Sequence, residues 1–252
     1  MGQGKKEWIS NLRVTAIISV ILLHVASTVL YKYNQVPSSY WWIGNVYDSF
    51  ARFSVPMFLM ITGALLLGRQ YSYPIFLKRK VIRILLPFVF WSAIYITYNF
   101  IEPPQFNGKL ASQSNFQWNL WYYFGYLGYL ILGYYLSIVN TKHKASCALA
   151  GFTFLFGLFI TAYGTYYYTD INGTFHKLYY AYLTPNVLLM TGSIFVLMKN
   201  VNIKLSGVLK KARNVIDKHS YGIYLSHILV LNYLIMYGVD WDLIHPLIEE
   251  VQ

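Results

Sequence analysis

The chain alternates long apolar stretches with short polar connections. Seven stretches are long and apolar enough to cross a membrane as helices, since a span needs about 20 apolar residues. They cover residues 10–32, 50–68, 82–101, 118–139, 145–168, 178–198 and 220–237. The strict alternation of a membrane β-barrel is absent from the sequence. The pattern predicts an all-α integral membrane bundle of about seven transmembrane helices, formed as a single domain over residues 1–252.

Composition supports the same fold class. Of 252 residues, 56% are hydrophobic and only 12% are charged, and the mean hydropathy is +0.41. The 25 tyrosines and 7 tryptophans suit a chain that crosses many membrane–water interfaces. The single cysteine, Cys147, excludes an intramolecular disulfide and a cysteine-based metal site, and we predict no metal.

Positive charge is distributed unevenly between the two sides of the predicted spans. A net charge of +11 would suit nucleic acid, yet all but four of the 20 Lys and Arg fall on one side. The positive-inside rule makes that side cytoplasmic. We therefore predict a multi-pass membrane protein in contact with lipids, without a nucleic-acid partner. Its N-terminus is predicted to be cytoplasmic and its C-terminus external. The four exceptions are Lys32, Arg52, Lys109 and Lys177.

The first span carries two ionisable side chains. Arg13 and His24 lie eleven residues apart in NLRVTAIISVILLHVAS (11–27), close to three helical turns, so they share a face roughly 16 Å apart along the axis. An ionisable residue inside a span costs a few kcal/mol, which favours a functional role. The alternative is an interfacial Arg13 that snorkels and a packed, neutral His24. We expect this segment to be a retained span and not a signal peptide.

The second span combines an ion pair with a proline. Asp48 and Arg52 are spaced i, i+4, and Pro56 predicts a kink that frees backbone carbonyls. Gly63 allows close contact with another helix. A kinked packing helix with a surface ion pair is the alternative.

Three further features suit ligand binding, each with a plainer alternative. A cytoplasmic basic patch suits either a phosphorylated cofactor or anionic lipid; it contains Lys78, Arg79, Lys80 and Arg83. Trp121 suits either a sugar face or the interfacial aromatic belt, and His227 either a site or simple packing. The outer connections 36–42, 102–117 and 169–176 are predicted to be irregular.

Five motifs occur in a fixed order along the chain. They are NLR before a span ending in LLH, FSVPMFLMITGALLL, FLKRKVIRILLPF, NLWYY and SYGIYLSH. In this order the chain resembles the acyltransferase 3 family, the multi-span bacterial O-acyltransferases that modify surface polysaccharides. It looks most like the O-acetyltransferases of enterobacterial common antigen and similar glycans. The resemblance implies an acyl-CoA donor, typically acetyl-CoA, bound from the cytoplasm. It also implies an acceptor hydroxyl on a surface glycan or its lipid-linked precursor.

The resemblance also implies roles for single residues. His24 would be the general base, or would briefly carry the acyl group, with Arg13 as its catalytic companion. The donor would be held by Lys78, Arg79 and Arg83. The acceptor would be held by Arg52, Trp121 and His227.

The chain has fewer predicted spans than is usual for the family. The second half of the fourth span, LGYLILGYYL, resembles a later family helix, so we expect two central spans to be missing. We also expect the last family span to be absent after DWDLIHPLIEEVQ. Such a shortened bundle would leave Arg52 and His227 poorly covered, and we expect either self-association into a homo-oligomer or low stability. The rival readings are a shortened, non-catalytic membrane protein that binds or exports a glycan, and an unrelated small transporter.

Overall fold

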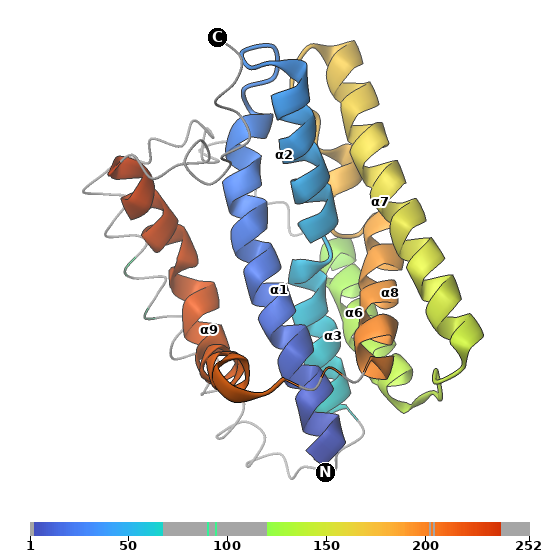
Figure 1. The fold of residues 1–252 in the computed structure, drawn as a ribbon. Coiled ribbons are helices and arrows are strands. Elements are labelled where there is room, and N and C mark those ends of the chain that lie inside the picture. Colours follow the sequence, from blue (N-terminus) through green and yellow to red (C-terminus); the bar gives the residue numbers. More distant parts are fainter. Residues whose placement is uncertain are drawn as a thin grey trace.

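The computed structural model describes residues 3–67, 90, 94, 120–201, 203 and 205–237. Its elements in this part of the chain are helical throughout (Figure 1). They are α1 (Gln3–Leu30), α2 (Ser38–Ala51), α3 (Ser54–Leu66), α6 (Leu120–Ile138), α7 (Lys144–Asn172), the short 3-10 helix η2 (Leu178–Tyr180), α8 (Pro185–Asn200) and α9 (Gly207–Met236). The predicted all-α class is confirmed.

Four helical segments of the described chain are long and apolar enough to cross a membrane, which supports the predicted helical membrane bundle. They are Glu7–Leu30, Ser38–Leu66, Lys144–Asn172 and Leu178–Asn200, with Gly125–Ile138 as a shorter apolar helix. The predicted span 82–101 lies outside the described residues. The long helix α9, which contains all but the last residue of the predicted span 220–237, is not among the four. The total of seven spans therefore stays a prediction.

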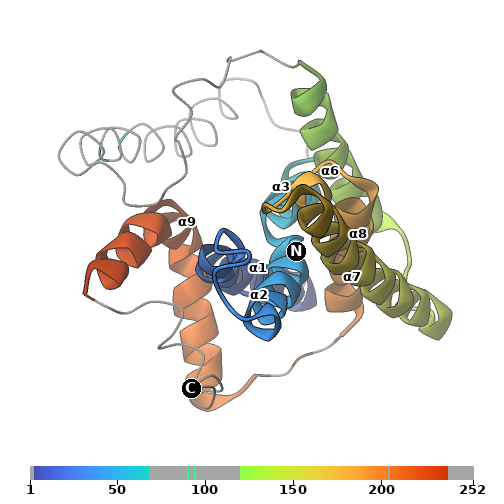
Figure 2. The same cartoon turned by 90° about the horizontal axis from the view of Figure 1, so that it is seen from above.

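Helix α1 lies at the centre of the described bundle. It contacts α2, α3, α8 and α9, while α3 packs against α6 and α7 packs against α8. Figures 1 and 2 show α9 on one flank of α1 and α7 on the other. The main core forms where α1, α3, α6 and α8 meet. Its best-buried side chains, each at most 1% exposed, include Leu12, Met57, Tyr129, Met190 and Phe195.

The outer surface of α7 is strongly apolar. Its exposed side chains recur at helical spacing and include Leu149, Phe152, Leu155, Phe156, Phe159, Tyr163 and Tyr167. Exposing such an apolar face to water is unfavourable, whereas lipid tails solvate it well. The face supports the assignment of α7 as a membrane helix.

Residues 36–42, predicted as an irregular outer loop, lie mostly in a helix. Helix α2 begins at Ser38, directly after Pro37. Trp41 is 1% exposed, and its indole Nε1 donates to the carbonyl of Leu30 at 3.1 Å. The sequence prediction was wrong because these aromatic residues pack inward instead of forming an interfacial loop.

The kink predicted in the second span is confirmed, and it lies one turn before Pro56. Helices α2 and α3 form one apolar segment that is interrupted at Arg52 and Phe53. Pro56 has no N–H for the carbonyl of Arg52, and its ring would collide with that carbonyl in a continuous helix. The interruption places Arg52 at the end of α2, facing the interior of the bundle.

A second irregular connection begins later than predicted and extends further along the chain. Helix α7 continues through Asn172, so the first half of the predicted loop 169–176 is helical. Gly173 then ends the helix with φ +66°, a left-handed conformation that glycine adopts without strain. The predicted span 178–198 begins with η2, and its α-helix starts at Pro185. This loop carries Tyr180 into the bundle.

Helices α3 and α6 approach each other through two glycines. A Cβ at Gly63 would lie 1.9 Å from the carbonyl oxygen of Leu130, and a Cβ at Gly133 would lie 2.1 Å from that of Met60. Neither distance is possible for a real side chain. The close contact predicted at Gly63 is therefore confirmed, and Gly133 is its counterpart.

Candidate functional site

Helices α1 and α9 meet through two pairs of polar side chains. Arg13 is ion-paired with Asp217, and the rings of His24 and His227 lie 4.9 Å apart between centroids. Eleven residues on α1 correspond to ten on α9 in the same direction, so the two helices run parallel. The prediction that Arg13 and His24 share one face of α1 is confirmed.

The Arg13 end of this contact is a polar cluster. The hydroxyl of Ser10 donates to Asp217 at 2.7 Å, and Arg213 donates to the side chain of Asn11 at 3.1 Å. The side chains of Arg13 and Asp217 are 25% and 21% exposed. The positive charge of Arg13 is therefore balanced by a carboxylate, which the sequence reading had not assigned to it.

Asp217 was missed by the sequence analysis, although the sequence held a signal. It is the only acidic residue in the strongly basic connection 199–219. A lone carboxylate among many cations suggests a specific partner. Helix α9 begins well before the predicted span and carries Asp217 to α1.

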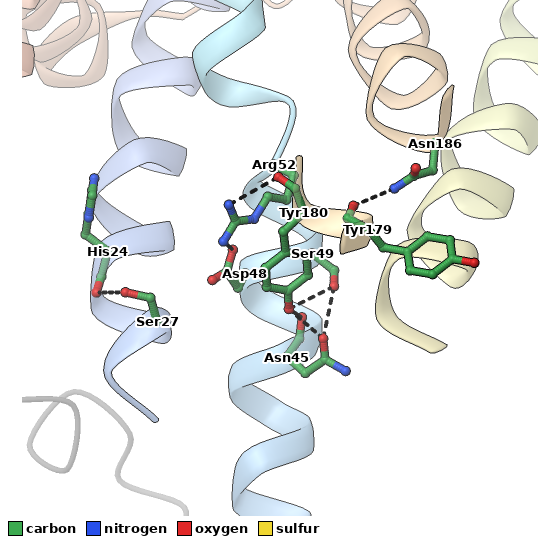
Figure 3. A network of polar contacts seen from close by, with 9 residues as sticks. All are labelled: His24, Ser27, Asn45, Asp48, Ser49, Arg52, Tyr179, Tyr180 and Asn186. Atoms are coloured by element: carbon green, nitrogen blue, oxygen red, sulfur yellow. Dashed lines mark hydrogen bonds and ion pairs between the residues drawn. The ribbon is translucent and has the colours of Figure 1, made fainter. Parts of the chain in front are cut away.

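His24 is half-buried beside α9. Within the described residues its imidazole makes no hydrogen bond, while its own carbonyl accepts one from Ser27 at 2.9 Å (Figure 3). The ring lies against His227 and is coupled electrostatically to Arg52. Neither ring nitrogen of His24 is therefore engaged by a described partner.

Arg52 forms a buried ion pair with Asp48. The two side chains lie 2.5 Å apart, with Asp48 at 0% and Arg52 at 12% exposure. The predicted i, i+4 pair is confirmed, but the alternative of a surface ion pair is wrong. In a low-dielectric interior an unpaired charge is costly, so each side chain offsets the charge of the other.

Tyr180 fixes the position of Arg52 from η2. The guanidinium lies over its ring, with Cζ 3.9 Å from the centroid, and donates to its carbonyl at 3.5 Å. The Tyr180 hydroxyl donates to the side-chain oxygen of Asn45 at 2.6 Å, and Ser49 completes the network (Figure 3). Nothing in the sequence distinguished Tyr180 from the other tyrosines.

Arg52 and His227 are both well covered, contrary to expectation. Asp48 and Tyr180 enclose Arg52, while His227 is 7% exposed and lies against His24 and Tyr224. The expectation was wrong because it counted missing helices and did not foresee that α9 and η2 fold back onto α1 and α2. Because Arg52 and His227 are well covered, they give no reason to expect self-association.

The remaining candidates are not placed by the structure. The proposed donor-binding residues Lys78, Arg79 and Arg83 lie outside the described residues, as does the side chain of Trp121. Among the others, His24 and His227 lie against each other within electrostatic range of Arg52, and Arg13 lies about three helical turns from His24 along α1. Neutral imidazole can accept a proton, and a nearby guanidinium favours developing negative charge. The cluster can therefore support proton transfer from a hydroxyl.

Of three comparisons with known proteins, one finds a match. No curated protein and no solved structure matches the chain. The family model described as an acyltransferase domain matches in two stretches, residues 6–137 and 106–249. The stretches overlap over most of the predicted span 118–139, where the sequence suggested that two family helices meet. Because the two stretches together reach from residue 6 to residue 249, the chain belongs to the acyltransferase 3 family, which is defined by this domain.

Proposed function

We propose that the protein transfers an acyl group, preferably acetyl, from cytoplasmic acyl-CoA to a hydroxyl of a cell-surface polysaccharide or its lipid-linked precursor. Family membership supports membrane acyl transfer in general. The observation that carries the finer proposal is the position of His24, inside an apolar helix, against His227 and within electrostatic range of Arg52. A base at that depth can serve a donor and an acceptor from opposite sides of the membrane.

His24 acts as the general base in this proposal. Its free ring nitrogen takes the proton of the acceptor hydroxyl while the hydroxyl oxygen attacks the thioester carbonyl. The new C–O bond forms and the C–S bond breaks. CoA leaves as a thiolate, which then takes the proton from His24. The products are an ester and free CoA thiol. An acyl group carried briefly on His24 is the variant of this scheme that the family resemblance leaves open.

The two substrates are proposed to approach His24 from opposite sides of the membrane. Lys78, Arg79 and Arg83 pair with the phosphates of CoA, which Arg and Lys recognise well. Arg13 lies on the same side and steers the donor, with its charge moderated by Asp217. The acceptor contacts are assigned to Arg52, Trp121 and His227.

The proposed location is the bacterial inner membrane with a cytoplasmic N-terminus. The uneven distribution of Lys and Arg supports this orientation. Reporter fusions after Lys109 and after Lys204 are expected to report the outer and the cytoplasmic side, respectively. The reverse pattern would place donor and acceptor on the wrong sides of the protein.

The direct test of the proposal is donor binding and turnover. Purified protein in detergent is titrated with acetyl-CoA, and the same protein in vesicles is given labelled acetyl-CoA with glycan extracts as acceptors. We expect saturable binding and label in the glycan. Without donor binding, the rival reading of a non-catalytic protein that binds or exports a glycan would replace the proposal.

A further inference from the structure

His227 presents one ring nitrogen that nothing in the described structure satisfies. Its Nδ1 lies 2.5 Å from the backbone carbonyl of Tyr224. Because a carbonyl oxygen only accepts hydrogen bonds, Nδ1 must carry the proton of the ring. Nε2 is then an acceptor with a free lone pair. It is buried and has no partner among the described residues.

An unpartnered acceptor inside a bundle calls for an explanation, because burying it without a hydrogen bond is costly. The nearest described polar ring is that of His24, with its centroid 4.9 Å away and the planes at 50°. A hydrogen bond of about 2.9 Å between nitrogens of two imidazoles separates their centres by roughly 5 Å. The observed spacing therefore suits such a bond, reached by rotation of the half-buried His24 ring.

Charged and titratable groups facing His24 leave this role to His227. From α2 come Asp48 and Arg52, and these two are paired with each other. From α9 come His227 and Tyr224, whose rings lie against each other. Helix α3 carries no ionisable side chain, and Lys199 at the end of α8 is engaged by the carbonyls of α6. The oxygens of Asp48 also lack a hydrogen bond, but Asp48 is held in the ion pair with Arg52, whereas Nε2 of His227 belongs to the ring that lies against His24.

We propose that His227 is a positioning residue that acts through His24. Its Nε2 accepts the N–H of His24, so the other nitrogen of His24 stays unprotonated and faces the acceptor hydroxyl. No proton passes to His227: the hydroxyl proton moves to His24 and then to the departing thiolate. This inference rests on the proposed function and replaces a direct acceptor contact of His227 with an indirect one.

Two isosteric substitutions separate the two nitrogens of the ring. His227→Asn places an amide near Nδ1 and leaves nothing at Nε2, whereas His227→Gln places an amide oxygen near Nε2. We expect Asn to lower kcat roughly 10- to 100-fold, the range for losing a hydrogen bond to a charged group, with little change in KM for the acceptor. Gln is expected to restore kcat to within about fivefold of wild type. Equal losses in both variants, or a rise in KM with unchanged kcat, would overturn the proposal.

Two further measurements distinguish the proposed role of His227 from misfolding of the variants. In a His24→Ala background, His227→Asn should cause no additional loss, because the two residues act as a unit. Nitrogen NMR of histidine-labelled wild-type protein should find His227 protonated at Nδ1. Protonation at Nε2 would contradict the proposal without any substitution. If wild type transfers no acyl group at all, it is the proposed function that fails, and this inference falls with it.

Discussion

Arg13 on α1 is ion-paired with Asp217 on α9, which lies 204 residues later in the chain. The pair sets the relative position of the two helices at the end predicted to be cytoplasmic. It also sets the register that brings His24 against His227 three turns further along. The charge pair and the contact between the proposed base and its partner therefore lie along the same α1–α9 interface.

We expect Asp217→Asn to destabilise the protein by about 1.5–3 kcal/mol, since a charge-assisted hydrogen bond between part-buried groups is lost. Thermal unfolding in detergent measures the effect. The matched control is Lys218→Gln, which removes an exposed charge from the neighbouring position and should change little. The charge-swapped pair Arg13→Asp with Asp217→Arg should recover part of the loss. A melting temperature for Asp217→Asn equal to that of the control would show that the pair contributes nothing.

Gly63→Ala and Gly133→Ala should each separate α3 from α6. A methyl group at either position would lie within about 2 Å of a backbone carbonyl, and the backbone cannot yield as a side chain can. We expect losses of about 1–3 kcal/mol or more, or a failure to accumulate in the membrane. Gly128→Ala is the control, because a Cβ there meets nothing within 4 Å. If all three variants unfold alike, the close approach of the helices is not what holds them together.

Asp48→Asn should be more damaging than its small change in shape suggests. It would leave Arg52 charged and without its carboxylate in the bundle, at a cost of about 3–5 kcal/mol. The double variant Asp48→Asn with Arg52→Gln removes both charges and should be more stable than Asp48→Asn alone. Denaturation in detergent compares the two. The buried-pair account fails if the double variant is the less stable one.

Reversing the charge of Arg79 and Arg83 should weaken the binding of CoA. The loss should be larger at low salt than at high salt, because salt screens exposed charges. Isothermal titration with CoA at two salt concentrations measures it, with charge reversal of the exposed Lys142 as the control. Unchanged binding would assign this basic patch to membrane orientation alone.

The class of the fold and the shared face of Arg13 and His24 were predictable from the sequence. Both follow from local periodicity, which a membrane helix obeys closely because it must satisfy its own backbone. The kink before Pro56 was also predictable, because it follows from the covalent structure of proline itself.

The partners of these residues were not predictable. Asp217 meets Arg13 and Tyr180 meets Arg52 across more than a hundred residues, and periodicity carries no information on such pairs. The prediction for residues 38–42 was wrong for another reason. Serines and aromatic residues after a proline are typical of an interfacial loop, yet here the aromatic rings fill space between α1 and α7.

The most direct test of the central claim is acyl transfer by His24 variants. Glycan O-acetylation is measured in cells that lack the native copy, with membrane levels of each variant checked by blot. Wild type should acetylate. His24→Ala and His24→Gln should both lose about 10²–10⁴-fold in rate, because glutamine keeps a hydrogen bond but cannot take a proton. If His24→Gln retains more than about a tenth of wild-type transfer, His24 is a packing residue and the proposed catalytic role is wrong.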